Sequence, residues 1–144
     1  MVSRSRRRVA AATLVAVLAT CASFCVFLPA FGLTAGSRAG GAAVLLFAVA
    51  IIGGWMAGAA AVRLARVITS QAASIEASPV GVAVAIANVL FPFVAPPIYN
   101  RFEDANQGAM IVFVILVSVA AFLASLLPPR PIPPEAGREH SVRG

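Results

Sequence analysis

The stretch "GGAAVLLFAVAIIGGWMAGAAAVRLARV", residues 40–67, decides the class of this protein. It contains no charged side chain before Arg63. As a helix rising 1.5 Å per residue, it is long enough to cross a hydrocarbon core about 30 Å thick. A helix that is apolar on every side belongs in a protein core or in a membrane. The stretch therefore predicts a transmembrane helix.

Charge-free runs of this kind recur along the 144 residues. They lie between Arg8 and Arg38, Arg38 and Arg63, Glu76 and Arg101, and Asp104 and Arg130. Each exceeds the roughly 20 residues that one crossing needs. Only 11% of the residues are charged, against about 25% in soluble domains. We predict an all-α integral membrane protein whose domain, residues 9–127, has four transmembrane helices at about 9–33, 41–67, 79–98 and 108–127.

The arginines indicate the orientation. The net charge is +6, and nine arginines flank the predicted helices on one side: Arg4, Arg6, Arg7, Arg8, Arg63, Arg66, Arg130, Arg138 and Arg143. Only Arg38 and Arg101 fall on the other side. This positive-inside bias predicts a multi-pass protein of the cell (inner) membrane with both termini in the cytoplasm. It also makes the lipid bilayer, and not nucleic acid, the expected partner of the basic residues.

The two ends of the chain are more polar than its middle. Residues 1–8 form a basic cytoplasmic N-terminus, and the proline-rich, charged residues 128–144, which include His140, are expected to be a disordered tail. The start "SRSRRRVAAATLVAVLATC" also resembles a signal peptide, and "LATC" a lipoprotein cleavage site. Because the apolar run continues past Cys21 to Leu33, we favour an anchor that is retained.

Cys21 and Cys25 lie four residues apart, on one face of the first predicted helix. A redox pair is one interpretation. Membrane thiol oxidoreductases, however, use CxxC at the membrane surface, whereas this CxxxC lies halfway along an apolar helix. We therefore expect small, buried packing residues.

Small residues line the second predicted helix. Gly54 and Gly58 form a GxxxG motif, and Gly53, Ala57 and Ala61 make a neighbouring stripe. Such stripes let helix backbones approach closely in lipid, so these residues are expected to be buried at a helix–helix contact. Trp55 stands among them and either fills core volume or faces a cavity. Core packing is the favoured alternative, because a lone aromatic residue usually packs.

The third predicted helix contains "NVLFPFVAPP", residues 88–97. Pro92 frees the carbonyl of Asn88 from its helical hydrogen bond, and Pro96 and Pro97 stop regular helix. These prolines are candidate hinge residues, or they mark an ordinary kink and a helix end. We expect a bend of more than about 20° near residues 88–92. The Asn88 side chain should turn inward and bond to a neighbouring helix, most plausibly the second.

Local signals complete the description of the chain. The second helix is expected to extend toward Ala73, and "ASP" predicts that Ser78 caps the third helix with Pro79 as its first residue. The polar residues of this region are expected to be solvated: Arg63, Arg66, Gln71 and Glu76. The stretch "GAMIVFVILVSVAAFLASLL", residues 108–127, is typical of an outer, lipid-facing helix.

The predicted spans contain no acidic or basic side chain that could relay protons or couple an ion. The sequence has no nucleophile–base pair, no metal-ligand cluster and no phosphate-binding loop. We therefore expect no enzymatic activity, no metal and no cofactor.

The order of these segments resembles the last four helices of major facilitator superfamily transporters. "SRSRRRVAAATLV" is similar to the end of the basic loop before the ninth helix, although the motif's acidic residue and glycines are missing. "RVITSQAASIEASPVGVAVAIAN" is similar to the link into the eleventh helix, with its Pro79, Gly81 and Asn88. "FVAPPIYNRF" occupies the position where members often end the eleventh helix with a stretch of small residues and prolines. The resemblance implies that the second segment lines a central cavity and makes Asn88 and Trp55 candidates for the substrate path.

Four helices lack the second half that alternating access requires. The first hypothesis is therefore a transporter-like portion that moves a small solute with helices supplied by a partner, or a truncated, inactive transporter. The second is an independent four-helix accessory subunit of a membrane complex, without transport activity of its own. A small dimeric drug exporter is the third, but that class depends on a glutamate in its first helix, which residues 9–33 lack. Other transporter helices or a second copy of the chain are the corresponding partners.

Overall fold

The computed structural model describes residues 2–34 and 40–131, in which every regular element is helical. In chain order these are α1 (Val2–Thr34), α2 (Gly40–Ile68), the 3-10 helix η1 (Ser70–Ser74), α3 (Ala77–Val94), the single turn α4 (Pro96–Tyr99) and α5 (Ala105–Leu126). Four of them, α1, α2, α3 and α5, are long and apolar enough to cross a membrane. The predicted all-α class and its four helices of spanning length are confirmed. Arg38 and the tail from residue 132, with His140, lie outside the described residues.

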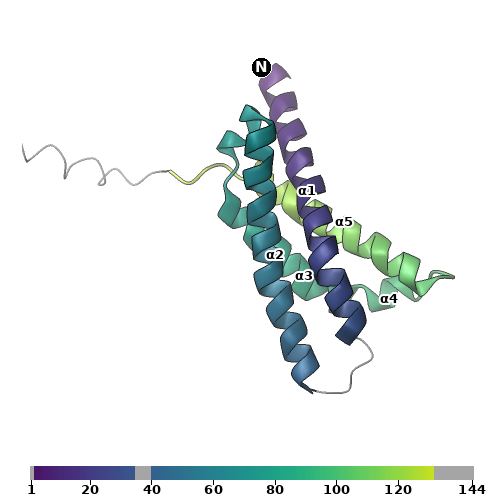
Figure 1. Cartoon of the computed structure of the whole chain (residues 1–144). Helices are drawn as coiled ribbons and strands as arrows, with labels where there is room; N and C mark the ends of the chain where they lie inside the picture. The colour runs from purple at the N-terminus through teal and green to yellow at the C-terminus, as the bar shows by residue number, and fades with distance from the viewer. Residues whose placement is uncertain (1, 35–39, 132–144) are drawn as a thin grey trace, which may run out of the picture.

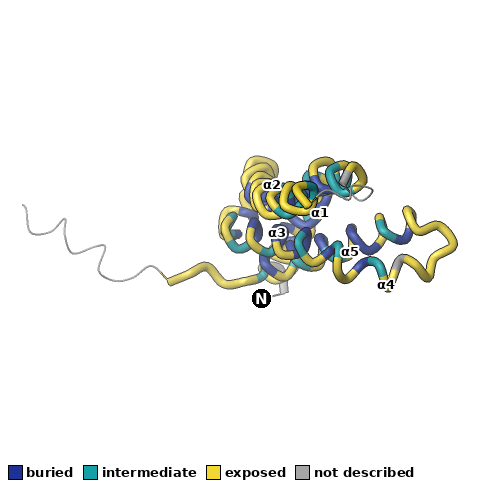
Figure 2. The backbone as a smooth tube through the Cα atoms, turned by 90° about the horizontal axis from the view of Figure 1, so that it is seen from below, coloured by how far each residue is buried: buried dark blue, intermediate teal, exposed yellow. Residues whose placement is uncertain are grey.

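The four long helices form a ring in which each packs mainly on two neighbours. α1 packs on α2 and α5, and α3 packs on the same two helices from the opposite side. α1 and α2 lie side by side, whereas α5 is inclined across the bundle (Figure 1). Seen from below, the buried residues face the middle of the bundle and the α4–α5 connection stands out to one side (Figure 2).

The first helix begins earlier than predicted. α1 starts at Val2, so Arg4 to Arg8 belong to the helix instead of a separate N-terminal segment. Arginine is a good helix former, and neither Gly nor Pro occurs before Pro29. The basic residues therefore extend α1 beyond its apolar part.

The link between α2 and α3 also departs from the prediction. α2 ends at Ile68, because Thr69 is extended and its hydroxyl accepts a hydrogen bond from the Gln71 N–H at 3.3 Å, which starts η1. The continuation toward Ala73 is thus 3-10 helix after a break. α3 begins at Ala77 with Glu76 as its N-cap, so Ser78 is not the cap. Pro79 still lies in the first turn, where its missing N–H has no helical partner to lose.

The last helix is not purely an outer one. Asp104 caps α5 by accepting hydrogen bonds from the N–H groups of Asn106 at 2.9 Å and Gln107 at 3.3 Å, so the helix starts at Ala105. One face of α5 is buried against α1 and α3, through Val112, Phe113, Val117 and Ala121. Its other face, which includes Ile115 and Val119, is exposed. The predicted lipid-facing character therefore applies to the exposed face of α5, and the opposite face belongs to the bundle core.

Phenylalanine rings fill the middle of the bundle. Phe27 of α1 stacks on Phe113 of α5 with 5.6 Å between ring centroids, and Phe91 of α3 meets Phe113 edge-on at 5.2 Å. Phe24 and Phe31 extend the group along α1. We call these five residues the phenylalanine cluster. It joins three of the four long helices and leaves α2 to be held by another kind of contact.

Candidate functional site

The contact between α2 and α3 is made by backbone atoms. A Cβ added to Gly58 would lie 2.7 Å from the Cα of Gly81, and a Cβ added to Gly54 would lie 2.8 Å from the Cα of Ala85. No side chain fits at such separations, so the two helices meet where both present small residues. We call these four residues the glycine interface. The GxxxG motif of the sequence thus lies against α3.

The neighbouring stripe of α2 is divided between two contacts. Ala57 and Ala61 are buried, whereas Gly53 is only half-buried and faces α1, where an added Cβ would lie 3.1 Å from a Val26 methyl group. Gly53 therefore belongs to the α1–α2 contact and not to the glycine interface.

Asn88 lies beside the glycine interface and is completely buried. Its Oδ1 accepts a hydrogen bond from the Ser23 hydroxyl of α1 at 2.9 Å. The expected partner was α2; the actual partner is α1. Its Nδ2 lies 2.8 Å from the position of a Cβ on Gly54 and has no hydrogen-bond partner. A buried amide left half-satisfied is costly, because neither lipid nor packed side chains replace the missing acceptor.

Ser23 was not singled out from the sequence. It is 1% exposed and, like Asn88, is a polar side chain deep within an apolar helix. That shared property is the signal that could have paired them.

The prolines divide the predicted third helix into two elements. The helix passes through Pro92 and continues to Val94, and the break falls at Ala95, before α4 begins at Pro96. The Ala95 N–H still bonds to the Phe91 carbonyl at 3.0 Å. The hinge candidates Pro92, Pro96 and Pro97 therefore belong to two elements: Pro92 to the body of α3 and the other two to the turn that follows. The predicted bend at residues 88–92 stays a prediction.

Trp55 does not pack in the core. It is 48% exposed, which makes the favoured expectation of core packing wrong. The reason is steric: Gly54 and Gly58 occupy the face of α2 that meets α3, and Trp55 lies at the edge of that contact. There its indole covers Gly81, whose Cβ would lie 2.9 Å from the indole Cδ1. Trp55 lines a hollow of about 420 Å³ together with apolar residues of α2 and α3, among them Ile51, Val82 and Ile86.

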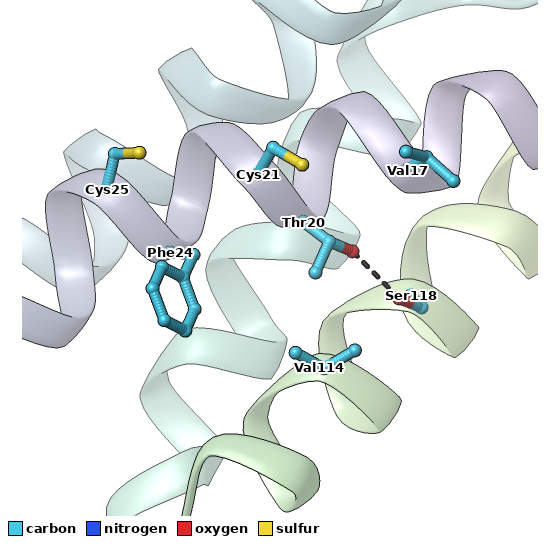
Figure 3. A pocket seen from close by; sticks show the side chains of 7 residues that line it. All are labelled: Val17, Thr20, Cys21, Phe24, Cys25, Val114 and Ser118. Carbon is cyan, nitrogen blue, oxygen red and sulfur yellow. Dashed lines mark hydrogen bonds between the residues drawn. The ribbon is translucent and has the colours of Figure 1, made fainter.

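Cys21 and Cys25 are both exposed, so the expectation of buried packing residues is also wrong. They line a hollow of about 400 Å³ between α1 and α5 (Figure 3). Inside it the Thr20 and Ser118 hydroxyls share a hydrogen bond of 2.8 Å across the two helices. The face of α1 that is buried carries Ala16, Ala19 and Ser23 instead, which leaves the cysteines on the outside of the ring.

Charged side chains connect the helix ends by hydrogen bonds, and two of them, Arg66 and Glu76, were expected to be solvated. Arg8 of α1 donates to the carbonyls of Leu126 and Leu127 at the end of α5, at 3.2 and 3.1 Å. Arg66 of α2 donates to the Ile75 carbonyl, and Glu76 accepts the Arg130 N–H at 2.9 Å. These bonds link all four long helices at one end. Arg63 and Gln71 are exposed, as expected.

The described residues contain no group of three or more side chains that could hold a metal ion. Comparison with known proteins gives no match to a family model, to a curated protein or to a solved structure.

Proposed function

We propose that this chain is a membrane-embedded helical module that takes part in the transport of a small solute, and that it acts only with further helices supplied by a partner. The four helices of spanning length provide the membrane anchorage. The arginine bias favours an inner-membrane location with both termini in the cytoplasm. The resemblance to the last helices of major facilitator superfamily transporters supplies the class of activity.

The requirement for further helices follows from the filled interior. Asn88, Phe91 and Phe113 are fully buried, and Phe27 is 1% exposed. Close packing of this kind leaves no passage for a solute between these side chains. A path must therefore run along the outside of the ring, where other helices complete its wall.

The exposure of Trp55 is the observation that carries the proposal. Indole is amphipathic, and a tryptophan that is well packed usually finds a partner for its N–H. Here half of the side chain is exposed, and its N–H has no hydrogen bond among the described residues. The hollow beside it is formed by α2 and α3. The resemblance implies that α2 lines the central cavity and that α3 lies near the interface between the two halves of such a transporter. We therefore assign this face to the substrate path and to the missing helices.

A photo-crosslinking amino acid at position 55, in membranes of the source cells, tests this assignment. We expect crosslinks to a protein with several transmembrane helices. A crosslinker at Ile115 of α5, which is 58% exposed, is the matched control and should label lipid only. Equal labelling at the two positions would contradict the proposal.

The second experiment asks what the pairing does. Proteoliposomes containing the chain and the crosslinked partner are assayed with a panel of labelled sugars, amino acids and cationic dyes. We expect flux that needs both proteins and that falls at least about tenfold in Trp55→Ala, as for loss of one well-placed contact. Flux that needs the chain but is unchanged in Trp55→Ala would favour an accessory subunit. The closed ring of helices, tied together at one end, is the observation that supports this second candidate.

A further inference from the structure

Charge is distributed very unequally between the two ends of the bundle. Among the described residues, one end carries a single carboxylate, Glu76, and seven arginines: Arg4, Arg6, Arg7, Arg8, Arg63, Arg66 and Arg130. The other end carries Arg101, Glu103 and Asp104. The hydrogen bonds of Arg8, Arg66 and Glu76 place the ends of all four long helices together at the arginine-rich end. We call it the basic end.

Several of these arginines are not needed to hold the chain together. Arg8 and Arg66 donate to backbone carbonyls, and Glu76 is engaged by a backbone N–H. The guanidinium groups of Arg4, Arg7 and Arg63 are exposed and have no hydrogen-bond or ion-pair partner among the described residues. Positive charge at this end therefore remains available to a ligand.

The geometry of α1 sets the level of these free charges. Arg8 is fixed beside the last carbonyls of α5, where the apolar part of that helix ends. Arg4 lies four residues further out, about 6 Å along the helix axis. A headgroup layer is about 5–8 Å deep on each side of the hydrocarbon core. Arg4 and Arg7 lie three residues apart and share a face of this outer turn of α1, so their guanidinium groups lie together at the depth of lipid phosphates.

We propose that the basic end binds anionic phospholipid headgroups, with Arg4 and Arg7 of α1 as the principal contacts. Guanidinium pairs with phosphate through two parallel hydrogen bonds, which suits the exclusive use of arginine here. Basic residues next to a membrane helix gain attraction from anionic lipid that falls off within the screening length. The lipid is held at the level where Arg8 joins α1 to α5, and this role is independent of any transported solute.

The test uses the full chain in neutral detergent, titrated with phosphatidylglycerol or phosphatidylcholine and followed by native mass spectrometry. We expect phosphatidylglycerol to bind more tightly than phosphatidylcholine, with the preference lost in high salt. Arg4→Gln/Arg7→Gln should weaken phosphatidylglycerol binding roughly 25-fold, since each basic residue near a surface contributes about fivefold and the two contributions multiply. Arg101→Gln, at the opposite end, is the matched control and should bind as the parent does.

Three results would overturn the proposal. One is equal binding of the two lipids by the parent chain, and another is an equal loss in Arg101→Gln and the double variant. The third is protection against heat by inorganic phosphate to the same extent as by phosphatidylglycerol, which would indicate a site for free anions instead. Circular dichroism of each variant verifies that the helices are intact. Because Arg4 and Arg7 make no bond within the described chain, their substitution should leave the fold unchanged.

Discussion

The glycine interface and the phenylalanine cluster hold neighbouring parts of one bundle by opposite means. At the first, α2 and α3 approach until backbone atoms touch, and nothing larger than hydrogen fits at Gly54 and Gly58. At the second, α1, α3 and α5 stay apart by the width of stacked rings. In lipid both depend on close packing, because no hydrophobic effect drives one apolar helix onto another. The first contact should therefore reject added atoms, and the second should suffer from removed ones.

The largest effect is expected for Gly58→Leu. A Cβ at this position meets the Gly81 backbone at 2.7–2.9 Å, and backbone cannot move aside as a side chain can. We expect destabilisation beyond the usual 1–3 kcal/mol of overpacking, seen as loss of monodisperse protein in detergent. Gly41→Leu is the control within the same helix, since a Cβ there meets nothing within 4 Å. Parent-like behaviour of Gly58→Leu would show that α2 and α3 do not touch here.

Phe113→Ala should have the next largest effect. The ring is fully buried and touches Phe24, Phe27 and Phe91, so its removal leaves a cavity. We expect a loss of about 3–5 kcal/mol in the free energy of unfolding, measured by denaturant titration in mixed micelles. Phe93→Ala serves as the comparison, because that ring is 65% exposed. Similar losses in both variants would contradict the claim that the phenylalanine cluster stabilises the bundle.

The bond between Ser23 and Asn88 connects the two regions, because Asn88 lies against Gly54 while its partner belongs to α1. A double-mutant cycle of Ser23→Ala and Asn88→Ala isolates it. We expect a coupling of about 0.6–2 kcal/mol, the range for interhelical hydrogen bonds in membranes. Additive losses would mean that the two side chains do not interact.

The smallest effect is expected at the end of the bundle. Arg8→Gln in neutral detergent should reduce the stability by less than about 1 kcal/mol, because the bond is exposed. Its signature is faster hydrogen exchange in the last turn of α5, whose carbonyls Arg8 caps. Arg7→Gln should leave that exchange rate unchanged. Equal rates in the two variants would argue against the hydrogen bonds from Arg8 to the end of α5.

These two regions also differ in what the sequence reveals. Gly54 and Gly58 form a recognisable motif, and a contact between small residues follows from its spacing. The phenylalanine cluster has no such pattern, because its rings come from three helices whose rotation and order only the tertiary packing determines. The same reason explains the errors at Trp55 and at the two cysteines. Apolar residues surround every position of these helices, so periodicity does not distinguish the lipid-facing side from the buried one.

Helix ends were mispredicted where a local capping signal competed with a continuous apolar or helical pattern. Asp104 is a clear N-cap, yet the apolar run alone placed the start of the last helix three residues later. The break after Ile68 depends on the hydroxyl of Thr69, which competes with a helical pattern that otherwise continues. For the site itself, the inward position of Asn88 follows from its isolation among apolar residues. Its partner Ser23 does not, because the pairing joins residues 65 positions apart.

The most direct test of the account concerns the four crossings themselves. Reporter fusions after residues 37, 75, 105 and 144 distinguish the two sides of the membrane. Four helices of spanning length and the arginine bias predict outside, inside, outside and inside, in that order. An outside signal at residue 144 would contradict the shared side of the two termini, and with it the ring of four membrane-spanning helices.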